Sequence, residues 1–139
     1  MPLSEKQQRL LEDYGIIEDA QERLSAVVDQ ARRHAPMPAT DRTEEKRVRG
    51  CISQVWLVGE LRAGRCHFRA DADSPLVRGL VTLVCEFFSD ATPAEILASD
   101  ADPLALLDLA RNLSPTRQNG LAAVRAAIRA FAAQAAPAP

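Results

Sequence analysis

The sequence has little lysine and few aromatic residues, and no glycine-rich phosphate loop. Lys6 and Lys46 are the only lysines among 139 residues, and aromatic residues make up 4%. Neither lysine lies in an expected core element, which disfavours an enzyme that forms a Schiff base on lysine. The glycine-containing segments GELRAGR and GRCHFRAD lack the lysine and serine of a phosphate-binding loop. Enzymes that form a Schiff base on lysine and proteins that bind phosphate through a glycine-rich loop are thereby disfavoured.

Clustered metal ligands are also missing. Three cysteines, Cys51, Cys66 and Cys85, are separated by 14 and 18 residues, and none belongs to a CxxC pair. His34 and His67 do not lie at metal-ligand spacing from each other or from a cysteine. These gaps match no zinc or iron–sulfur ligand pattern, so we expect neither a metal nor another bound cofactor.

Strong charge and long apolar runs are absent as well. The formal net charge is -2, with acidic and basic residues mixed along the chain, so we expect no nucleic-acid partner. The apolar run LVTLVCEFF is interrupted by Glu86 and is too short to cross a bilayer. The N-terminal segment MPLSEKQQRL has no apolar leader core. We therefore expect a cytoplasmic protein with reduced thiols and no membrane contact.

The hydrophobic pattern predicts one α+β domain over residues 1–139, with two layers. Helical spacing indicates N-terminal helices over about 3–35. A sheet is expected over about 45–71, where residue types alternate at 55–61 and again at 66–71. We expect three short strands there, a first one at 45–49 and two more joined by a turn at Gly64, forming an antiparallel sheet. A helical half follows over about 75–134, and its segment 75–88 is apolar almost all round, which is typical of a central buried helix.

The three cysteines have different predicted surroundings. Cys85 lies within the apolar helix and Cys66 on the core face of its strand, so both are expected to be buried and inert. Cys51 follows Gly50 on a connection between expected strands, where reactive side chains are often held. Placement alone leaves an inert loop cysteine open as the alternative.

Four segments resemble motifs of the SufE family, in the family's order. GCISQVW (50–56) resembles its GCxSxVW signature, and DADSPLVRGL (71–80) its DSDAxIVKGL segment. TPAEI (92–96) is similar to TPxEI, and NLSPTRQNGL (112–121) to HLSPSRxNGL. The resemblance covers about residues 5–134.

The resemblance implies a function and a fold. SufE proteins accept sulfur from pyridoxal-phosphate cysteine desulfurases in iron–sulfur cluster biogenesis, on a fold shared with IscU-type scaffolds. Cys51 falls on the family's acceptor cysteine and would carry the sulfur as a persulfide. The implied partners are a desulfurase of the SufS or CsdA type, which would hold the pyridoxal phosphate, and a downstream iron–sulfur scaffold. We expect a monomer or a weak homodimer.

Several residues around the acceptor position are expected to matter. Gly50, Ile52, Ser53 and Gln54 would form the loop and contact the partner. Ile52 replaces the family's usual glutamine, and Asn112 its usual histidine. Because no histidine neighbours Cys51, we take Arg117 as the hypothetical positive charge that favours its thiolate, with a solvated or salt-bridged arginine as the alternative.

Two other functions stay open at this point. The chain could be a non-catalytic module that regulates a desulfurase without accepting sulfur, or a thiol redox enzyme. The redox enzyme is disfavoured because no resolving cysteine lies close to Cys51 in sequence. In the sulfur-acceptor reading, the chain is a transpersulfidation partner rather than a stand-alone enzyme.

Overall fold

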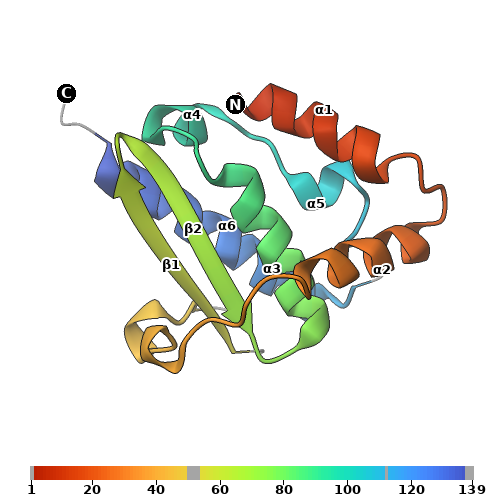
Figure 1. Ribbon diagram of the computed structural model, residues 1–139, viewed down its shortest axis with the longest axis horizontal. Coiled ribbons are helices and arrows are strands. Elements are labelled where there is room, and N and C mark those ends of the chain that lie inside the picture. The colour runs from red at the N-terminus through yellow and green to blue at the C-terminus, as the bar shows by residue number, and fades with distance from the viewer. Residues whose placement is uncertain (1, 50–53, 112, 137–139) are drawn as a thin grey trace.

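The computed structural model describes residues 2–49, 54–111 and 113–136. A short antiparallel hairpin packs on a group of helices, as Figure 1 shows. Mixed α+β architecture, the coarse expectation from sequence, is confirmed. The elements in chain order are α1 (Leu3–Tyr14), α2 (Ala20–Ala31), the 3-10 turns η1 (Ala39–Asp41) and η2 (Glu44–Lys46), β1 (Val55–Arg62), β2 (Arg65–Ala72), α3 (Pro75–Phe88), α4 (Pro93–Ala98), α5 (Pro103–Leu106) and α6 (Pro115–Ala135).

The hairpin has a two-residue connection. β1 and β2 pair from Val55 opposite Ala72 to Arg62 opposite Arg65. Between them Ala63 and Gly64 adopt φ angles of 51° and 77°. Two central residues with positive φ match the right-handed twist of the strands, which is the reason such turns close tight hairpins. The turn expected at Gly64 is confirmed.

The prediction of a first strand at 45–49 is wrong: these described residues do not form a strand. Residues 44–46 form the turn η2, and Arg47 makes only an isolated bridge to Trp56. The Val48 amide still donates to the Val55 carbonyl at 2.8 Å. The chain thus touches the edge of β1 but does not run along it. The described sheet has two strands, because alternation of residue types cannot report whether a segment finds a long enough edge.

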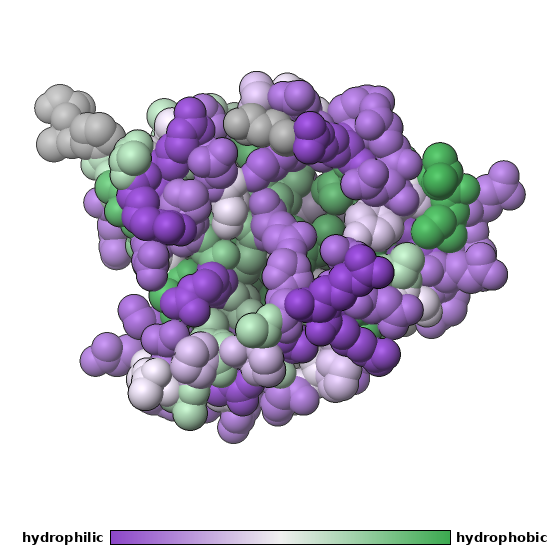
Figure 2. Space-filling view, viewed as in Figure 1, coloured by the Kyte–Doolittle hydropathy of each residue, from purple (hydrophilic) through white to green (hydrophobic). Residues whose placement is uncertain are grey.

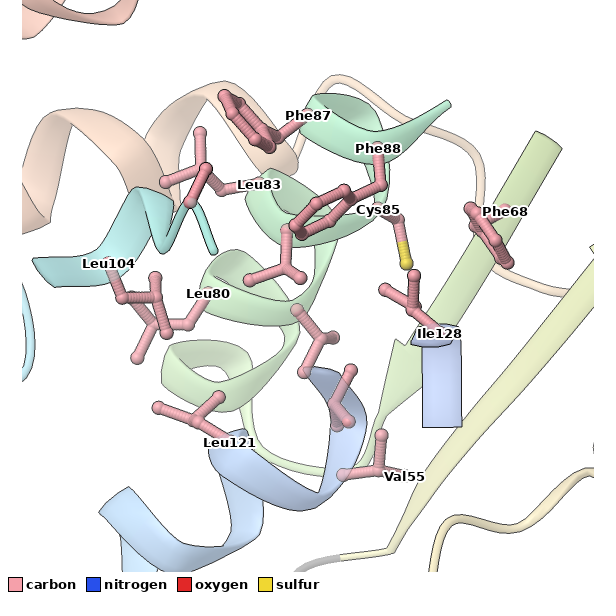
Figure 3. Packing of buried hydrophobic residues seen from close by; sticks show 14 of the residues in the cluster. Val55, Phe68, Leu80, Leu83, Cys85, Phe87, Phe88, Leu104, Leu121 and Ile128 are labelled. Atoms are coloured by element: carbon pink, nitrogen blue, oxygen red, sulfur yellow. The ribbon is translucent and has the colours of Figure 1, made fainter. Parts of the chain in front are cut away.

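Helix α3 forms the centre of the core. Its buried positions lie on nearly every side, and its neighbours are β2, α2, α5 and α6. Phe88, Leu80 and Val81 are all at most 2% exposed. Figure 3 shows side chains of α3 meeting Leu104, Leu121 and Ile128 from the later helices. The central buried helix predicted from sequence is confirmed.

Side-chain caps start the helices of the second half. Ser74, Thr92, Asp102 and Ser114 each accept a hydrogen bond from a backbone N–H in the first turn, and a proline follows each of them. Proline loses no hydrogen bond at this position and has the φ that a helix needs. Thr92 and Glu95 complete a capping box.

The sheet packs its inner face on α6 as well as on α3. Phe68 of β2 meets Phe131 of α6 edge to face, with ring centroids 5.4 Å apart. Gly59 lies under the same ring, since a Cβ there would approach Phe131 to 2.8 Å. The hairpin and α6 can therefore approach closely only because this strand position lacks a side chain.

The N-terminal helix is attached to the far end of α3 by one of the two lysines. Lys6 Nζ donates to the Phe87 carbonyl at 2.9 Å and to the Glu86 and Ser89 carbonyls. A cation at these carbonyls complements the negative end of the helix dipole. Burial lowers the pKa of Lys6 against the opposing effect of nearby carboxylates.

We predict that Gly79→Ala destabilises the protein. A Cβ at Gly79 would lie 2.9 Å from the backbone Cα of Val28, where α2 crosses α3. Overpacking of this kind costs about 1–3 kcal/mol, more than the gain of about 1 kcal/mol from helix propensity. Urea unfolding measures the difference. Val28→Ala should restore part of the loss by removing Cγ2, and an unchanged Gly79→Ala midpoint would contradict the close packing.

Candidate functional site

The predicted acceptor segment falls mostly outside the described residues. Gly50, Cys51, Ile52 and Ser53 are not among them, and neither is Asn112. Gln54 is described and is exposed. The site is therefore built from the residues on which this connection begins and ends.

Two backbone hydrogen bonds hold the ends of the connection. On one side, Val48 N donates to Val55 O at 2.8 Å. On the other, Asp73 N donates to Gln54 O at 3.1 Å. The described residues on either side of 50–53 are thus both hydrogen-bonded at the edge of the sheet, beside the start of α3. We call the four residues Val48, Gln54, Val55 and Asp73 the loop frame.

The other two thiols are buried, as predicted. Cys66 is 0% and Cys85 3% exposed, and neither forms a disulfide. Figure 3 shows the Cys85 sulfur pointing from α3 toward Ile128. Burial raises the pKa of Cys66, and burial followed by the charge of Glu86 raises the pKa of Cys85 to about 12. Since the thiolate is the nucleophile, neither residue suits sulfur transfer at neutral pH.

Arg117 lies in the first turn of α6 and is exposed. Its backbone N–H donates to Ser114 Oγ at 3.2 Å. The side chain borders a surface groove with Leu76, from the first turn of α3, and with Gln21 of α2. Because α3 begins just after Asp73 of the loop frame, this groove lies at the same end of the sheet as the frame. No described carboxylate forms an ion pair with the Arg117 guanidinium.

From the sequence, a positive rim for an acidic partner could be formed by Arg62, Arg65, Arg69 and Arg78, although a solvated face is the favoured alternative. In the structure, the first three have acidic or carbonyl partners. Arg62 pairs with Glu60, and Arg69 with Asp41 and Glu60. Arg65 donates to the Asp90 carbonyl. Such contacts favour the alternative reading of a solvated, locally neutralised face.

Arg78 differs, because it reaches a buried carboxylate. Asp71 is 1% exposed and is the one buried charged residue among those described. Its Oδ1 lies 3.1 Å from Arg78 Nε and its Oδ2 2.6 Å from Arg42 Nη2. The Met37 N–H also donates to Oδ2, at 2.9 Å. In the sequence, Asp71 is marked only by its place in DADSP, a rearranged form of the family's DSDA. A carboxylate on a strand, with arginines far away in sequence, carries no local signal.

Trp56 belongs to the same group of residues. It lies directly opposite Asp71 in the hairpin, and the Arg42 guanidinium carbon lies 5.3 Å from the centre of its ring. A cation over an indole face is attracted by the ring electrons. The sequence leaves two roles open for Trp56, a docking contact or packing on its strand, with packing favoured. The contact with Arg42 is consistent with packing.

Exposed apolar side chains lie elsewhere. Ile16 is 77% and Leu61 47% exposed. Figure 2 shows a mostly hydrophilic face with an apolar group at its edge, where Figure 1 draws the connection between α1 and α2. Leu61 stands at the other end of β1 from the loop frame. No helix within residues 2–49, 54–111 and 113–136 is both long and apolar enough to cross a membrane, and these residues contain no group of three potential metal ligands.

Comparison with known proteins decides the family. The sequence model of the SufE family, described as an Fe-S metabolism associated domain, matches residues 8–132. This chain belongs to the SufE family. An uncharacterized SufE-like protein of Rhizobium meliloti is 34% identical over 118 residues, covering 81% of this chain and 84% of that protein.

A solved structure supports the fold alone. The solution structure of a hypothetical protein from Thermus thermophilus is 20% identical, with a TM-score of 0.74 over 94% of this chain and 95% of that one. Two of the four segments that resemble SufE motifs meet in space at the loop frame. GCISQVW supplies Gln54 and Val55, and DADSPLVRGL supplies Asp73, so two motifs share the Asp73–Gln54 hydrogen bond.

We predict that Asp71→Asn lowers the free energy of unfolding by about 3 kcal/mol at pH 7, because two arginines lose their buried partner. Burial alone would raise the pKa of Asp71, but hydrogen bonds from Met37 N, Ala72 N and Arg42 outweigh it and lower the pKa. The ionised Asp71 therefore contributes its full stabilisation above the unfolded-state pKa of about 3.9. This stabilisation is lost as the pH falls through the lower pKa of the folded state.

The difference in free energy of unfolding between wild type and Asp71→Asn should accordingly shrink below about pH 4. Denaturant unfolding across pH measures it. Asp29→Asn is the matched control, because Asp29 is exposed and its ion pair is with the exposed Arg32. Its effect should stay under about 0.5 kcal/mol. A pH-independent difference for Asp71→Asn would contradict an ionised Asp71.

Proposed function

We propose that this SufE-family chain is a sulfur acceptor that takes persulfide sulfur on Cys51 from a cysteine desulfurase and passes it on for iron–sulfur cluster assembly. By emptying the active-site cysteine of the desulfurase, it raises the turnover of that enzyme. The observation that carries the proposal is the family match together with the burial of the other two thiols, Cys66 and Cys85.

The transfer is a displacement at sulfur. The Cys51 thiolate attacks the outer sulfur of the persulfide on the desulfurase cysteine. A new S–S bond forms at Cys51 while the S–S bond of the donor breaks. The donor cysteine leaves as a thiolate and takes up the proton that Cys51 lost. The outer sulfur changes carrier, and no external oxidant or reductant is consumed.

The surroundings of the loop frame support a docking role for Gly50, Ile52, Ser53 and Gln54. Gln54 is exposed, and the frame holds both ends of this segment at the edge of the sheet. A partner can thus approach the connection while the frame keeps its ends in place. Pyridoxal phosphate belongs to the desulfurase, of the SufS or CsdA type, and an iron–sulfur scaffold is the later recipient. The protein acts in the cytoplasm as a monomer or weak dimer.

Arg117 provides the positive charge for the reacting thiolate. Its position at the groove beside the start of α3, without a described carboxylate partner, supports this role. A cation near a thiol lowers its pKa and enlarges the reactive fraction at neutral pH.

Cys51→Ser should abolish sulfur transfer. Wild-type chain mixed with a desulfurase and free cysteine, without reductant, should gain one sulfur atom by intact mass, and Cys51→Ser should gain none. Cys66→Ala is the matched control, since it removes a buried thiol and should leave the gain intact. Binding to the desulfurase without any gain of sulfur would instead favour a regulatory module.

Arg117→Ala should raise the pKa of the Cys51 thiol and slow transfer at neutral pH. A loss of about tenfold in rate corresponds to about one pKa unit. The pH profile of Cys51 alkylation and the rate of sulfur gain measure both effects. Arg62→Ala removes another exposed arginine, at the opposite end of β1, and should change neither. Unchanged values in Arg117→Ala would remove Arg117 from the mechanism.

A further inference from the structure

Asp71 and its partners join three segments that are distant in sequence. Arg42 and Met37 belong to the connection between α2 and the sheet, Arg78 belongs to α3, and Asp71 itself lies near the end of β2. Two guanidinium groups and two backbone N–H groups, those of Met37 and Ala72, point at one carboxylate. Arg78 Nη2 also donates to the His34 carbonyl at 2.9 Å, which fixes the start of the same connection.

This group lies next to the loop frame on both strands. Asp71 is two residues before Asp73, whose N–H holds Gln54. Opposite Asp71, Trp56 follows Val55, whose carbonyl holds Val48. A shift of the hairpin at the Trp56–Asp71 pair would therefore move both hydrogen bonds of the frame together.

Arg42 links the Asp71 carboxylate to Trp56, and through it to the chain just before Val48 of the loop frame. Its guanidinium carbon lies over the Trp56 ring, while Nη2 reaches Asp71 Oδ2. Trp56 in turn bridges to Arg47, the residue before Val48. A planar, forked cation can satisfy a carboxylate and an aromatic face at once. The chain entering residues 49–54 is thus held by Asp71 through Arg42.

We propose that Asp71 is a positioning residue for sulfur transfer, which acts through Arg42 and Trp56 to set the geometry of the loop frame that carries residues 49–54. This inference rests on the proposed function of Cys51. Asp71 donates no proton and touches no substrate in this role. Its charge orients the chain segments on either side of the acceptor cysteine.

A positioning residue can affect the rate of transfer because displacement at sulfur requires an aligned approach of three sulfur atoms. Misplacing a reacting group by about 1 Å can cost on the order of a hundredfold in rate. A loosened frame should thus lower the rate of the transfer step within the docked complex more than it weakens docking. That predicts a loss in kcat with little change in KM.

The test measures desulfurase turnover against the concentration of added chain, for Asp71→Asn and Arg42→Met. Arg42 is partly exposed, with 35% of its side chain accessible, so its variant keeps the test valid if Asp71→Asn fails to fold. Each variant should lower kcat about tenfold and change KM less than about twofold. The double variant should be no worse than either single one within about twofold, since both remove the same contact.

Ser89→Ala is the matched control. Its hydroxyl bonds to Phe68 N at 3.0 Å and to the Cys85 carbonyl, so it secures β2 to α3 at the end away from the frame. Its loss should lower stability but leave kcat within about twofold of wild type. If Asp71→Asn and Arg42→Met behave like Ser89→Ala while still folded, Asp71 is structural only and the inference is wrong.

A second readout separates this inference from the proposed function. The alkylation rate of Cys51 by a small reagent, followed across pH by peptide mass, requires no desulfurase. It should change at least about threefold in Asp71→Asn and Arg42→Met and stay constant in Ser89→Ala. An unchanged alkylation profile overturns the role of Asp71. Failure of wild-type chain to gain sulfur, with an altered profile in these variants, overturns the acceptor function and leaves Asp71 as the residue that positions the loop.

Discussion

Burial of α3 is the constraint on which the rest of the structure depends. This helix is apolar on nearly every side, and no single neighbour can cover it. β2 lies on one side, α2 on another, and α5 and α6 cover much of the remainder. Each fully buried large side chain contributes about 1.5–3 kcal/mol by leaving water. The hairpin is too small to be stable alone, and it gains its stability by covering this helix.

The same burial accounts for the two cysteines that the structure describes, Cys66 and Cys85. Cys85 is part of the α3 surface that must be covered, and Cys66 lies on the strand face that covers it. In both, the apolar surroundings disfavour the thiolate, so the pKa is raised. Burial alone thus keeps the Cys66 and Cys85 thiols unreactive, and neither of them forms a disulfide. The core protects them.

Asp71, the buried charge among the described residues, differs from these apolar side chains because its burial is unfavourable by itself. Burying Asp71 costs free energy unless partners surround it, and four donors do so. Those donors come from segments that share no secondary structure. An apolar residue there could contribute similar stability, but it would not specify one arrangement of Arg42 against Trp56. The cluster lies where the α2–β1 connection, the sheet and α3 meet, next to the loop frame.

Local signals in the sequence were sufficient for much of the fold. The four Ser, Thr or Asp residues before proline are a local signal of helix starts, since a cap and its helix are neighbours in sequence. Gly64 marked the hairpin turn, and the all-round apolar run marked α3 as central. The family motifs were likewise contiguous segments, so the amino-acid order alone was enough to indicate the family and the candidate residue Cys51.

Tertiary structure decided whatever depends on partners far apart in sequence. A strand was expected at residues 45–49, but among the described residues this segment meets β1 only at Trp56 and Val55. Asp71 became a candidate only because the fold brings Arg42, 29 residues before it, to its carboxylate. Arg78 was grouped with surface arginines until the fold placed it against Asp71. Periodicity and caps act over one or two turns of chain, whereas a buried charge and a strand edge are completed by residues that only folding brings together.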